Sequence, residues 1–175
     1  WTEGNNINTA RRYSGHFGIQ TAAVICAGET GVVAATEEYN GTSWSNGNDV
    51  NTPNSHIGGS GTLTAGLKCG GSPTSAATEE YDGTDWTSVN NMNTARRADS
   101  LFGLQTAAIL AGGYTTTQVA NVEEYDGTTW TVLHSVAEYQ DGWGEGETRS
   151  YDGLAHVDAF THYRWDFPAS GKPRQ

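Results

Sequence analysis

The feature of this sequence that most restricts its fold is an eight-residue stretch that occurs three times. It reads Glu-Glu-Tyr-Asp-Gly-Thr-Thr-Trp at 123–130, and near copies stand at 37–44 and 79–86. The final tryptophan recurs about every 43 residues, at Trp1, Trp44, Trp86 and Trp130. A period of this size indicates a chain built from copies of one supersecondary unit, as in propellers and solenoids. We call the eight-residue stretch the marker.

Each repeat contains signals for four short strands. A short apolar run closed by glycine, typical of a buried strand, occurs at 21–28, 64–71 and 106–113. Inside each marker, Asn-Gly or Asp-Gly follows the tyrosine and favours a tight hairpin turn, so the marker supplies one strand, a turn and the start of another. With a further strand between the Asn-Thr-Ala-Arg-Arg segment and the apolar run, each repeat forms the four-stranded antiparallel blade of a β-propeller.

Two residue types in the repeat have a clear physical role in such a blade. A glycine pair at a strand end lets the backbone turn or approach another segment closely, as we expect for Gly70, Gly71, Gly112 and Gly113. Large aromatic side chains fill the gap between neighbouring blades and keep a polar tip for a partner. We assign that role to the marker residues Tyr39, Trp44, Tyr81, Trp86, Tyr125 and Trp130, and to Trp1.

The apolar run ending in Gly-Gly, followed by Tyr and then Trp, resembles the kelch repeat. The repeat sequences are also similar to the kelch-like repeats of tail and appendage proteins from marine bacteriophages. The segments that carry this similarity are Asn-Thr-Ala-Arg-Arg, Thr-Ala-Ala and Glu-Glu-Tyr-Asp-Gly-Thr-Thr-Trp. Two departures stand out: Ala27-Gly28-Glu29 lacks the double glycine, and the Tyr-to-Trp spacing is a little shorter than the family usually shows. The resemblance covers 1–130 and implies an all-β, kelch-like β-propeller with three clear four-stranded blades.

The remaining residues, 131–175, do not repeat the pattern in phase, although they carry many aromatic side chains. We expect a divergent fourth blade, a cap or a separate small segment. Trp1 to Glu3 could supply the strand that closes a ring. The chain opens without an initiator methionine or signal peptide, which indicates a processed product or, as we favour, a piece of a longer protein. A closed ring of four blades, a ring shared between chains and a larger propeller all stay open.

Charge excludes one class of partner. The formal net charge is −11 and the isoelectric point is about 4.6, whereas nucleic-acid binding needs clustered Lys and Arg. No run of 18 apolar residues exists, so we expect no insertion into a membrane.

The two cysteines, Cys26 and Cys69, occupy the same place in neighbouring repeats, and equivalent positions run side by side rather than meeting. Buried free thiols are therefore favoured over a disulfide.

The arginine pairs Arg11-Arg12 and Arg96-Arg97 admit two interpretations. Arginine can clamp a carboxylate or phosphate, so a ligand site on the rim is one. The other, which we favour, is ion pairing across strands or blades, because the glutamate pairs of the markers recur with the same period. The middle repeat has neither arginine, since Asn54-Ser55 stands in their place.

Other candidate chemistry is weak. His156, Asp158 and His162 lack further convergent ligands for zinc or iron. The acidic stretch 141–147 lacks the pattern of a calcium loop, so we expect no metal and no cofactor. No nucleophile elbow exists, and 58–61 lacks the Lys-Ser/Thr of a phosphate-binding loop. Adjacent glutamates on a strand point to opposite faces, and the sequon Asn40-Gly41-Thr42 is explained by the hairpin turn.

These observations predict a non-enzymatic structural or binding protein. We expect an extracellular or virion appendage component, such as part of a tail fibre, that offers a platform for assembly or for attachment to a host surface. Its partners would be other subunits, copies of itself or a host glycan. The alternative is a lectin-like or carbohydrate-active propeller whose site contains His156, Asp158 and His162. An intracellular adaptor is disfavoured, because no adaptor domain accompanies the repeats.

Overall fold

The computed structural model of the chain describes residues 3–31, 33–98 and 100–133, and this part consists of strands and connecting loops. Its twelve strands form three four-stranded antiparallel sheets, and none of the described residues lies in a helix. The prediction of an all-β fold with four strands per repeat is confirmed, and the fold is that of a β-propeller-like protein. In the described part, no helix is long and apolar enough to cross a membrane.

Each repeat forms one sheet, which we call a blade. Blade 1 contains β1 (Gly15–Ile19), β2 (Ala22–Cys26), β3 (Thr36–Tyr39) and β4 (Trp44–Asn46). Blade 2 contains β5 (Gly58–Thr62), β6 (Ala65–Cys69), β7 (Thr78–Tyr81) and β8 (Trp86–Val89). Blade 3 contains β9 (Leu101–Leu104), β10 (Ala107–Ala111), β11 (Val122–Tyr125) and β12 (Trp130–Leu133). In every blade the strands are hydrogen-bonded in chain order.

The marker forms the hairpin between the last two strands of each blade. In blade 1, Tyr39 pairs with Trp44 across the two strands. The Asn40 side chain accepts the backbone N–H groups of Thr42 and Ser43, both at 2.9 Å, and Gly41 takes a positive φ of 91°. Asp82 and Asp126 make the same pair of turn hydrogen bonds in blades 2 and 3. The turn therefore requires a short side-chain acceptor followed by glycine, and all three markers supply them.

The glycine pairs lie where the second strand of a blade ends. Gly70 and Gly71 have φ values of 74° and 135°, a backbone region that favours glycine. A Cβ atom on Gly70 would come within 2.6 Å of the Ala98 side chain, so the position also requires a close approach. Gly112 and Gly113 repeat these conformations in blade 3. Ala27 stands at the equivalent of Gly70 and nevertheless takes a φ of 53°.

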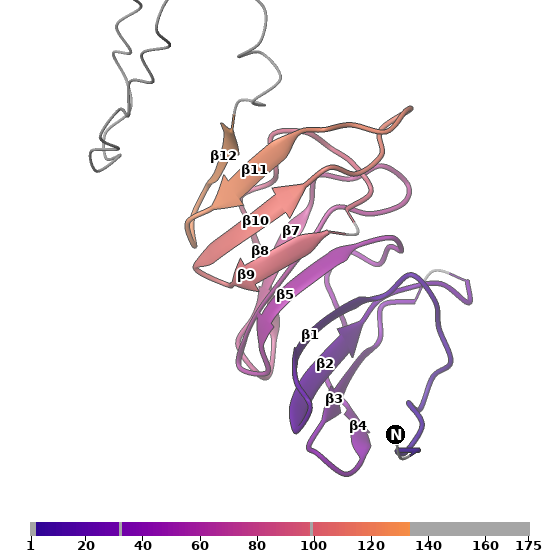
Figure 1. Ribbon diagram of the computed structural model, residues 1–175. Coiled ribbons are helices and arrows are strands. Elements are labelled where there is room, and N and C mark those ends of the chain that lie inside the picture. The colour runs from indigo at the N-terminus through magenta and orange to yellow at the C-terminus, as the bar shows by residue number, and fades with distance from the viewer. Residues whose placement is uncertain (1–2, 32, 99, 134–175) are drawn as a thin grey trace, which may run out of the picture. The chain divides into compact units, whose positions relative to one another are not determined.

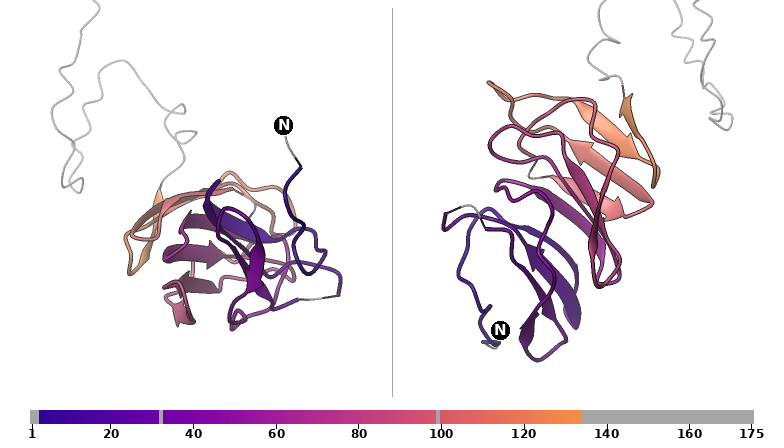
Figure 2. Two further views of the ribbon diagram at one scale, coloured as in Figure 1. Left: turned by 90° about the horizontal axis from the view of Figure 1, so that it is seen from below. Right: turned by 180° about the vertical axis from the view of Figure 1, so that it is seen from behind.

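The three blades pack side by side along their first strands. β1 lies next to β5, and β5 lies next to β9, as Figures 1 and 2 show from different directions. Two apolar clusters fill the gaps between the blades. The first joins Phe17 and Val24 of blade 1 to Tyr81 and Trp86 of blade 2. The second includes Leu67 of blade 2 and the marker aromatics of blade 3, so the markers of blades 2 and 3 each pack against the preceding blade.

Two calls from the sequence fall at or beyond the limits of the described part. Trp1 lies outside it, so its role as an additional marker residue stays a prediction. Glu3 is described and belongs to no strand. Residues 134–175, which include all but three residues of the expected fourth blade or cap, also lie outside.

Candidate functional site

The repeats allow three structurally equivalent positions to be compared within one chain. A side chain that all three blades keep is one that the blade itself uses, whereas a position occupied by different residues is not fixed by the fold. The first glutamate of each marker belongs to the first group. Glu37, Glu79 and Glu123 are fully buried.

These glutamates hold the loop that enters each blade. Glu79 accepts the backbone N–H groups of Asn51 and Thr52, both at 2.8 Å. Glu37 and Glu123 accept the equivalent pairs of N–H groups in their own blades. The second glutamates, by contrast, face the other side of the sheet and are less buried. The prediction that adjacent glutamates do not converge is confirmed, and these carboxylates have a structural use.

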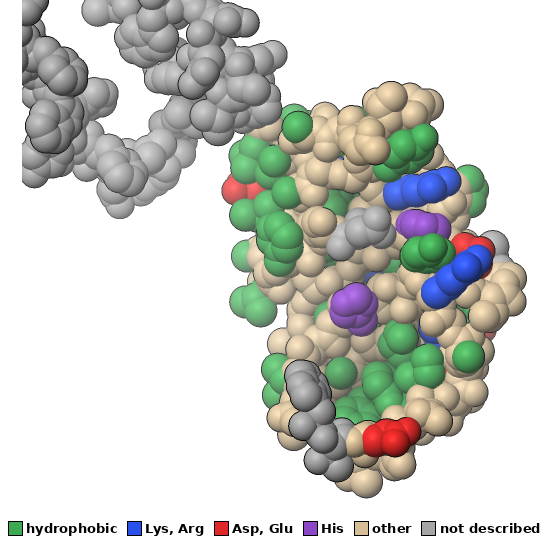
Figure 3. All heavy atoms as spheres, turned by 45° about the vertical axis from the view of Figure 1, so that its right-hand side comes forward, with side chains coloured by type: hydrophobic (Ala, Val, Ile, Leu, Met, Phe, Trp, Pro, Cys, Tyr) green, Lys and Arg blue, Asp and Glu red, His purple; other side chains and the backbone are tan. Residues whose placement is uncertain are grey.

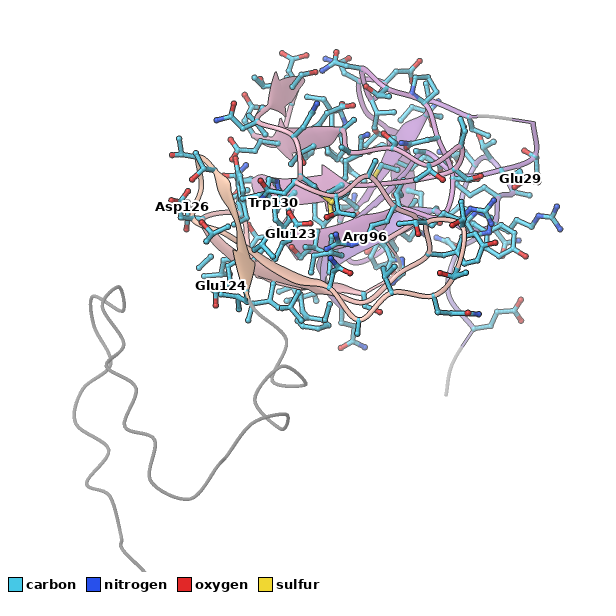
Figure 4. All side chains as sticks on the ribbon, turned by 90° about the horizontal axis from the view of Figure 1, so that it is seen from above. Glu29, Arg96, Glu123, Glu124, Asp126 and Trp130 are labelled. Carbon is cyan, nitrogen blue, oxygen red and sulfur yellow. The ribbon has the colours of Figure 1, made fainter. Side chains whose placement is uncertain are left out.

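The first arginine of each pair neutralises this buried carboxylate. The side chains of Arg11 and Glu37 are both completely buried and form an ion pair. Arg96 and Glu123 form the same pair, with 2.5 Å between Nη1 and Oε1, and they point toward each other in Figure 4. Burial opposes ionisation of Glu123, but hydrogen bonds from Asn93 and Arg96 outweigh it and lower the pKa. The ion-pair interpretation is confirmed for these two arginines.

The middle blade reaches the same charge balance with a different residue. Lys68 lies on β6, beside Glu79 on β7, and its Nζ is 2.9 Å from Glu79 Oε1. It also donates to the carbonyl oxygen of Thr52 at 3.2 Å. Asn54, which stands where Arg11 and Arg96 stand, donates instead to the carbonyl oxygen of Gly70 at 2.7 Å. Lys68 was not among the predicted site residues, although a lysine inside an apolar run of the repeat that lacks arginine is a detectable signal.

For the second arginines, the prediction of ion pairing across strands holds for Arg12, with a partner other than a marker glutamate, and is wrong for Arg97. Arg12 pairs with Glu29 at 2.9 Å, not with a marker glutamate, and both side chains are partly exposed. Arg97 forms no ion pair within the described part, and its guanidinium lies 5.3 Å from the centroid of the Tyr114 ring. The physical reason is strand geometry, because adjacent residues of an extended segment point in opposite directions. One arginine of each pair therefore faces the buried glutamate and the other faces outward.

The outward arginines belong to a surface group that we call the end cluster. Its exposed or half-buried members are Arg12, Tyr13, Glu29, His56, Arg97 and Tyr114, and Ser55, which is buried, contacts Glu29 and His56. Equivalent backbone bridges place its members at one position in the three blades, namely Arg12 with Glu29, Ser55 with Ser72, and Arg97 with Tyr114. Figure 3 shows Arg, His and hydrophobic side chains next to one another on one face of the molecule.

Contacts between blades connect the members of the end cluster. The Tyr13 and His56 rings stack with their centroids 3.9 Å apart and an interplanar angle of 17°. The guanidinium of Arg12 lies 5.2 Å from the Tyr13 ring centroid. His56 donates its backbone N–H to Tyr13 at 2.8 Å, and Ala98 donates to His56 at 3.1 Å. The hydrogen bond from Arg12 lowers the pKa of Glu29, so this carboxylate is ionised at neutral pH.

The marker aromatics form hydrogen bonds between blades as well as apolar contacts. Trp86 Nε1 donates to Thr36 Oγ1 of the preceding blade at 2.9 Å, and Trp130 donates to Thr78 at 3.0 Å. The Tyr81 hydroxyl donates to Glu38, and the Tyr125 hydroxyl donates to Glu80 at 2.8 Å. Burial raises the pKa of both tyrosines, and the acceptor carboxylates raise it further. Tyr39 and Trp44 of blade 1 are only half-buried.

Neither cysteine is an available nucleophile. Cys26 and Cys69 are free, completely buried thiols, as predicted. Burial raises the pKa of each to about 12, so both stay protonated at neutral pH. The described residues contain no group of three or more His, Cys, Asp or Glu side chains that could hold a metal ion. His156, Asp158, His162 and the acidic stretch 141–147 lie outside this part, and no finding tests them.

Comparison with known proteins identifies the fold and leaves the activity open. Neither a protein-family model nor a curated protein sequence matches the chain. The solved structure of YjhT is similar, with a TM-score of 0.58 over 71% of this chain at 12% sequence identity. At that identity the likeness defines the fold class alone, a β-propeller-like assembly of four-stranded sheets. The matched part covers 46% of the YjhT chain, so this chain spans less than half of that protein.

Proposed function

We propose that this chain is a non-enzymatic structural and binding repeat protein whose blades form a stiff platform for the end cluster. The single observation that carries the proposal is the contrast between the two sets of equivalent positions. The buried marker residues recur in all three blades, whereas the cluster position holds Arg12, Ser55 and Arg97. Arg12 is exposed, Arg97 is half-buried and Ser55 is buried, so the fold does not fix the residue at this position. The exposed parts of the two arginines are therefore free to serve recognition.

The blades also suit a kelch-like assembly or attachment protein. This proposal is supported by the kelch-like sequence of the repeats and by its similarity to the appendage proteins of marine bacteriophages. We therefore propose a kelch-like propeller in a virion or another extracellular appendage, with other protein subunits as its partners. Modular blades that each pack on the preceding one provide the rigidity that a platform needs.

A non-enzymatic role is supported by how the reactive side chains are used. Among the described residues, the buried carboxylates are neutralised by Arg11, Lys68 and Arg96 and are also occupied by backbone N–H groups. General acid–base catalysis requires a titratable group that can reach a substrate. The carboxylates that the three cations neutralise are sealed inside the blades and serve to hold the entering loops.

Glycan binding is a second candidate function, and the end cluster favours a specific form of it. Tyr13 is 49% exposed and its ring stacks on His56, so its exposed part is suited to contact with a sugar ring. Arg12 and Arg97 add guanidinium groups that bind carboxylates in a bidentate manner. We propose an acidic saccharide as the ligand class. The sequence analysis placed such a site in 131–175, a segment in which only 131–133 are described.

A glycan array and a particle-association assay on the full chain test the two functions together. We expect retention of acidic saccharides, or association with purified appendages, by the unaltered chain, and loss of either in Arg12→Ala/Arg97→Ala. Thr42→Ala, which changes an exposed marker turn outside the cluster, is the control and should behave as the unaltered chain. Binding that survives the double substitution would refute the role of the cluster, and turnover of a substrate would refute the non-enzymatic assignment.

A further inference from the structure

The two blade–blade contacts among the described residues are built from the same parts. In each, the later blade inserts its marker Tyr and Trp, and the earlier blade receives them with a Glu and a Thr. The indole nitrogen–hydroxyl distances are 2.9 Å for Trp86 with Thr36 and 3.0 Å for Trp130 with Thr78. The two interfaces therefore have one inserting face and one receiving face each.

Blade 3 has a receiving face that no described residue covers. Strand register places Phe102, Ile109 and Glu124 in one row across the sheet, equivalent to Phe17, Val24 and Glu38 in blade 1. Phe102 and Ile109 are 52% and 38% exposed, whereas Phe17 and Val24 are 8% and 1% exposed.

A hollow of about 380 Å³ lies on the same face and is lined in part by Ile109, Glu124 and Thr131. In the first interface the equivalent glutamate receives the inserted Tyr81 hydroxyl. The hollow therefore lies where a further marker tyrosine would insert.

Blade 1 has the matching inserting face. Its Tyr39 and Trp44 rings have centroids 5.0 Å apart, compared with 4.8 Å for Tyr81 and Trp86 and 5.0 Å for Tyr125 and Trp130. The uncovered marker thus already has the geometry that the two covered markers use. Within the described part of the chain, no acceptor receives the Tyr39 hydroxyl.

We propose that the receiving face of blade 3 binds the inserting face of blade 1 in a second copy of this chain. This inference rests on the proposed role as an assembly platform and names the chain itself as a partner. The contact is head-to-tail, because its two faces differ. Contacts of this type produce a closed ring when the rotation closes and a filament when it does not.

Two positions make this contact weaker than those within the chain. The Phe17 ring packs on Gly66, where a Cβ atom would lie 2.2 Å from the ring, whereas a second copy would bring Ala23 against Phe102. In addition, Val122 replaces the threonine that accepts the indole N–H at the other two interfaces. A reversible association, dependent on concentration, follows from these two mismatches.

Sedimentation velocity of the full chain tests the proposal. We expect association that increases with protein concentration and also with salt, because each copy has a formal charge of −11 and salt screens the repulsion. Phe102→Asp should weaken it at least tenfold, since a carboxylate would be buried on the receiving face. Val132→Asp, at a 42% exposed position on the opposite face of the same blade, is the matched control and should leave it unchanged.

Substitutions that copy the internal interfaces should strengthen the association. Val122→Thr restores the missing acceptor and Ala23→Gly removes the methyl group facing Phe102. Each variant is expected to lower the dissociation constant about fivefold. For Val122→Thr this is the effect of one ordinary hydrogen bond, and we expect a similar gain from relieving the contact at Ala23. Tyr39→Phe, which keeps the ring and removes the hydroxyl, should weaken binding by about tenfold because the hydrogen bond is to a charged acceptor.

A mixing experiment distinguishes head-to-tail from head-to-head contact. Phe102→Asp leaves the inserting face intact and Ala23→Leu leaves the receiving face intact, so each alone should be monomeric and their mixture should form a one-to-one complex. A chain that stays monomeric at its highest soluble concentration, even as Ala23→Gly/Val122→Thr, would overturn the proposal. So would association that Phe102→Asp does not weaken in a folded variant. Arg12→Ala/Arg97→Ala should not affect association, so failure of the end cluster and failure of this contact are separable.

Discussion

The middle blade and its two neighbours solve the same electrostatic problem differently. In blades 1 and 3 the buried marker glutamate is neutralised by an arginine from the loop that precedes the blade, Arg11 or Arg96. In blade 2 the cation is Lys68, which comes from the adjacent strand. The comparison teaches that the blade requires a buried cation at this place and not a particular residue, because an unpaired buried charge is costly.

The middle blade also differs in how tightly it meets its neighbours. Against blade 1 it presents Gly66, on which the Phe17 ring lies directly. Toward blade 3 it presents Ser60, at the position equivalent to Phe17, and blade 3 answers with Ala108 at the position equivalent to Gly66. A large residue therefore faces a small one at the first interface, whereas both equivalent positions hold small residues at the second.

Removing the cation of the middle blade is expected to have the largest effect on stability. Lys68→Met leaves Glu79 buried without a cation and should lower the free energy of unfolding by about 3–5 kcal/mol. Urea denaturation followed by tryptophan fluorescence measures the loss. Adding Glu79→Gln should recover part of it, because the unpaired charge is removed. A loss below about 1 kcal/mol would show that the pair is not needed.

Converting the middle blade to the pattern of its neighbours sharpens the comparison. Lys68→Leu alone should be strongly destabilising, and Asn54→Arg added to it should restore about half of the loss, roughly 2 kcal/mol, because the new arginine occupies the place of Arg11 and Arg96. A double-mutant cycle of urea unfolding curves gives the coupling. No coupling would mean that the entering loop of blade 2 cannot bring an arginine to Glu79.

Adding one methyl group should disrupt the close contact between blades 1 and 2. Gly66→Ala places a Cβ atom 2.2 Å from the Phe17 ring and should cost about 1–3 kcal/mol through overpacking. The thermal midpoint and urea unfolding report the change. Gly4→Ala is the control, since a Cβ atom there would meet nothing within 4 Å. Equal stabilities for the two variants would contradict the packing described here.

Acidification should reduce the contribution of the buried Glu123 ion pair in blade 3 to the stability of the fold. The folded chain lowers the pKa of Glu123 below its ordinary value of 4.5, so its contribution is present above that pH and is lost as the pH falls through the folded pKa. Unfolding free energy measured from neutral pH down to about pH 3 should therefore decline below about pH 4.5. Glu123→Gln should show a shallower decline, and an unchanged slope would count against this assignment.

The smallest effect is expected for the exposed pair. Arg12→Ala removes the contact between Arg12 and Glu29, whose side chains are 67% and 35% exposed, and should leave the midpoint of urea unfolding unchanged within error, because water screens an exposed ion pair. Urea unfolding at two salt concentrations is the measurement. A clear fall in the unfolding midpoint would place Arg12 among the residues that stabilise the blade.

Much of the fold could be predicted from the sequence because each strand and turn signal occurs in all three repeats. The apolar runs, the Asx-Gly turns and the marker spacing predicted the four strands of each blade and the hairpin that joins the last two. Pairing of arginine with glutamate was also predicted correctly for Arg11 and Arg96. The shared period of arginine and glutamate indicated this pairing in the two repeats that contain the arginines, but it did not indicate which residue of each pair takes part.

What the sequence could not supply depends on contacts between segments far apart in the chain. The direction of the extended entering loop decides which arginine of each pair points inward. Arg12 and Arg97 point outward and therefore belong to the end cluster. The substitution of Lys68 for the missing arginine depends on strand register, which places it beside Glu79. That no described residue covers Phe102 on blade 3 depends on where the described blades lie.

The sequence by itself therefore determined the repeating unit, its strands and its turns, because these follow from local backbone preferences and from the alternation of side chains. Only the tertiary structure decided which cation neutralises each buried carboxylate, which side chains reach the surface together and which blade faces have a neighbour. The physical reason is that burial and pairing are properties of segments brought together from distant positions, and one repeat read alone does not contain them.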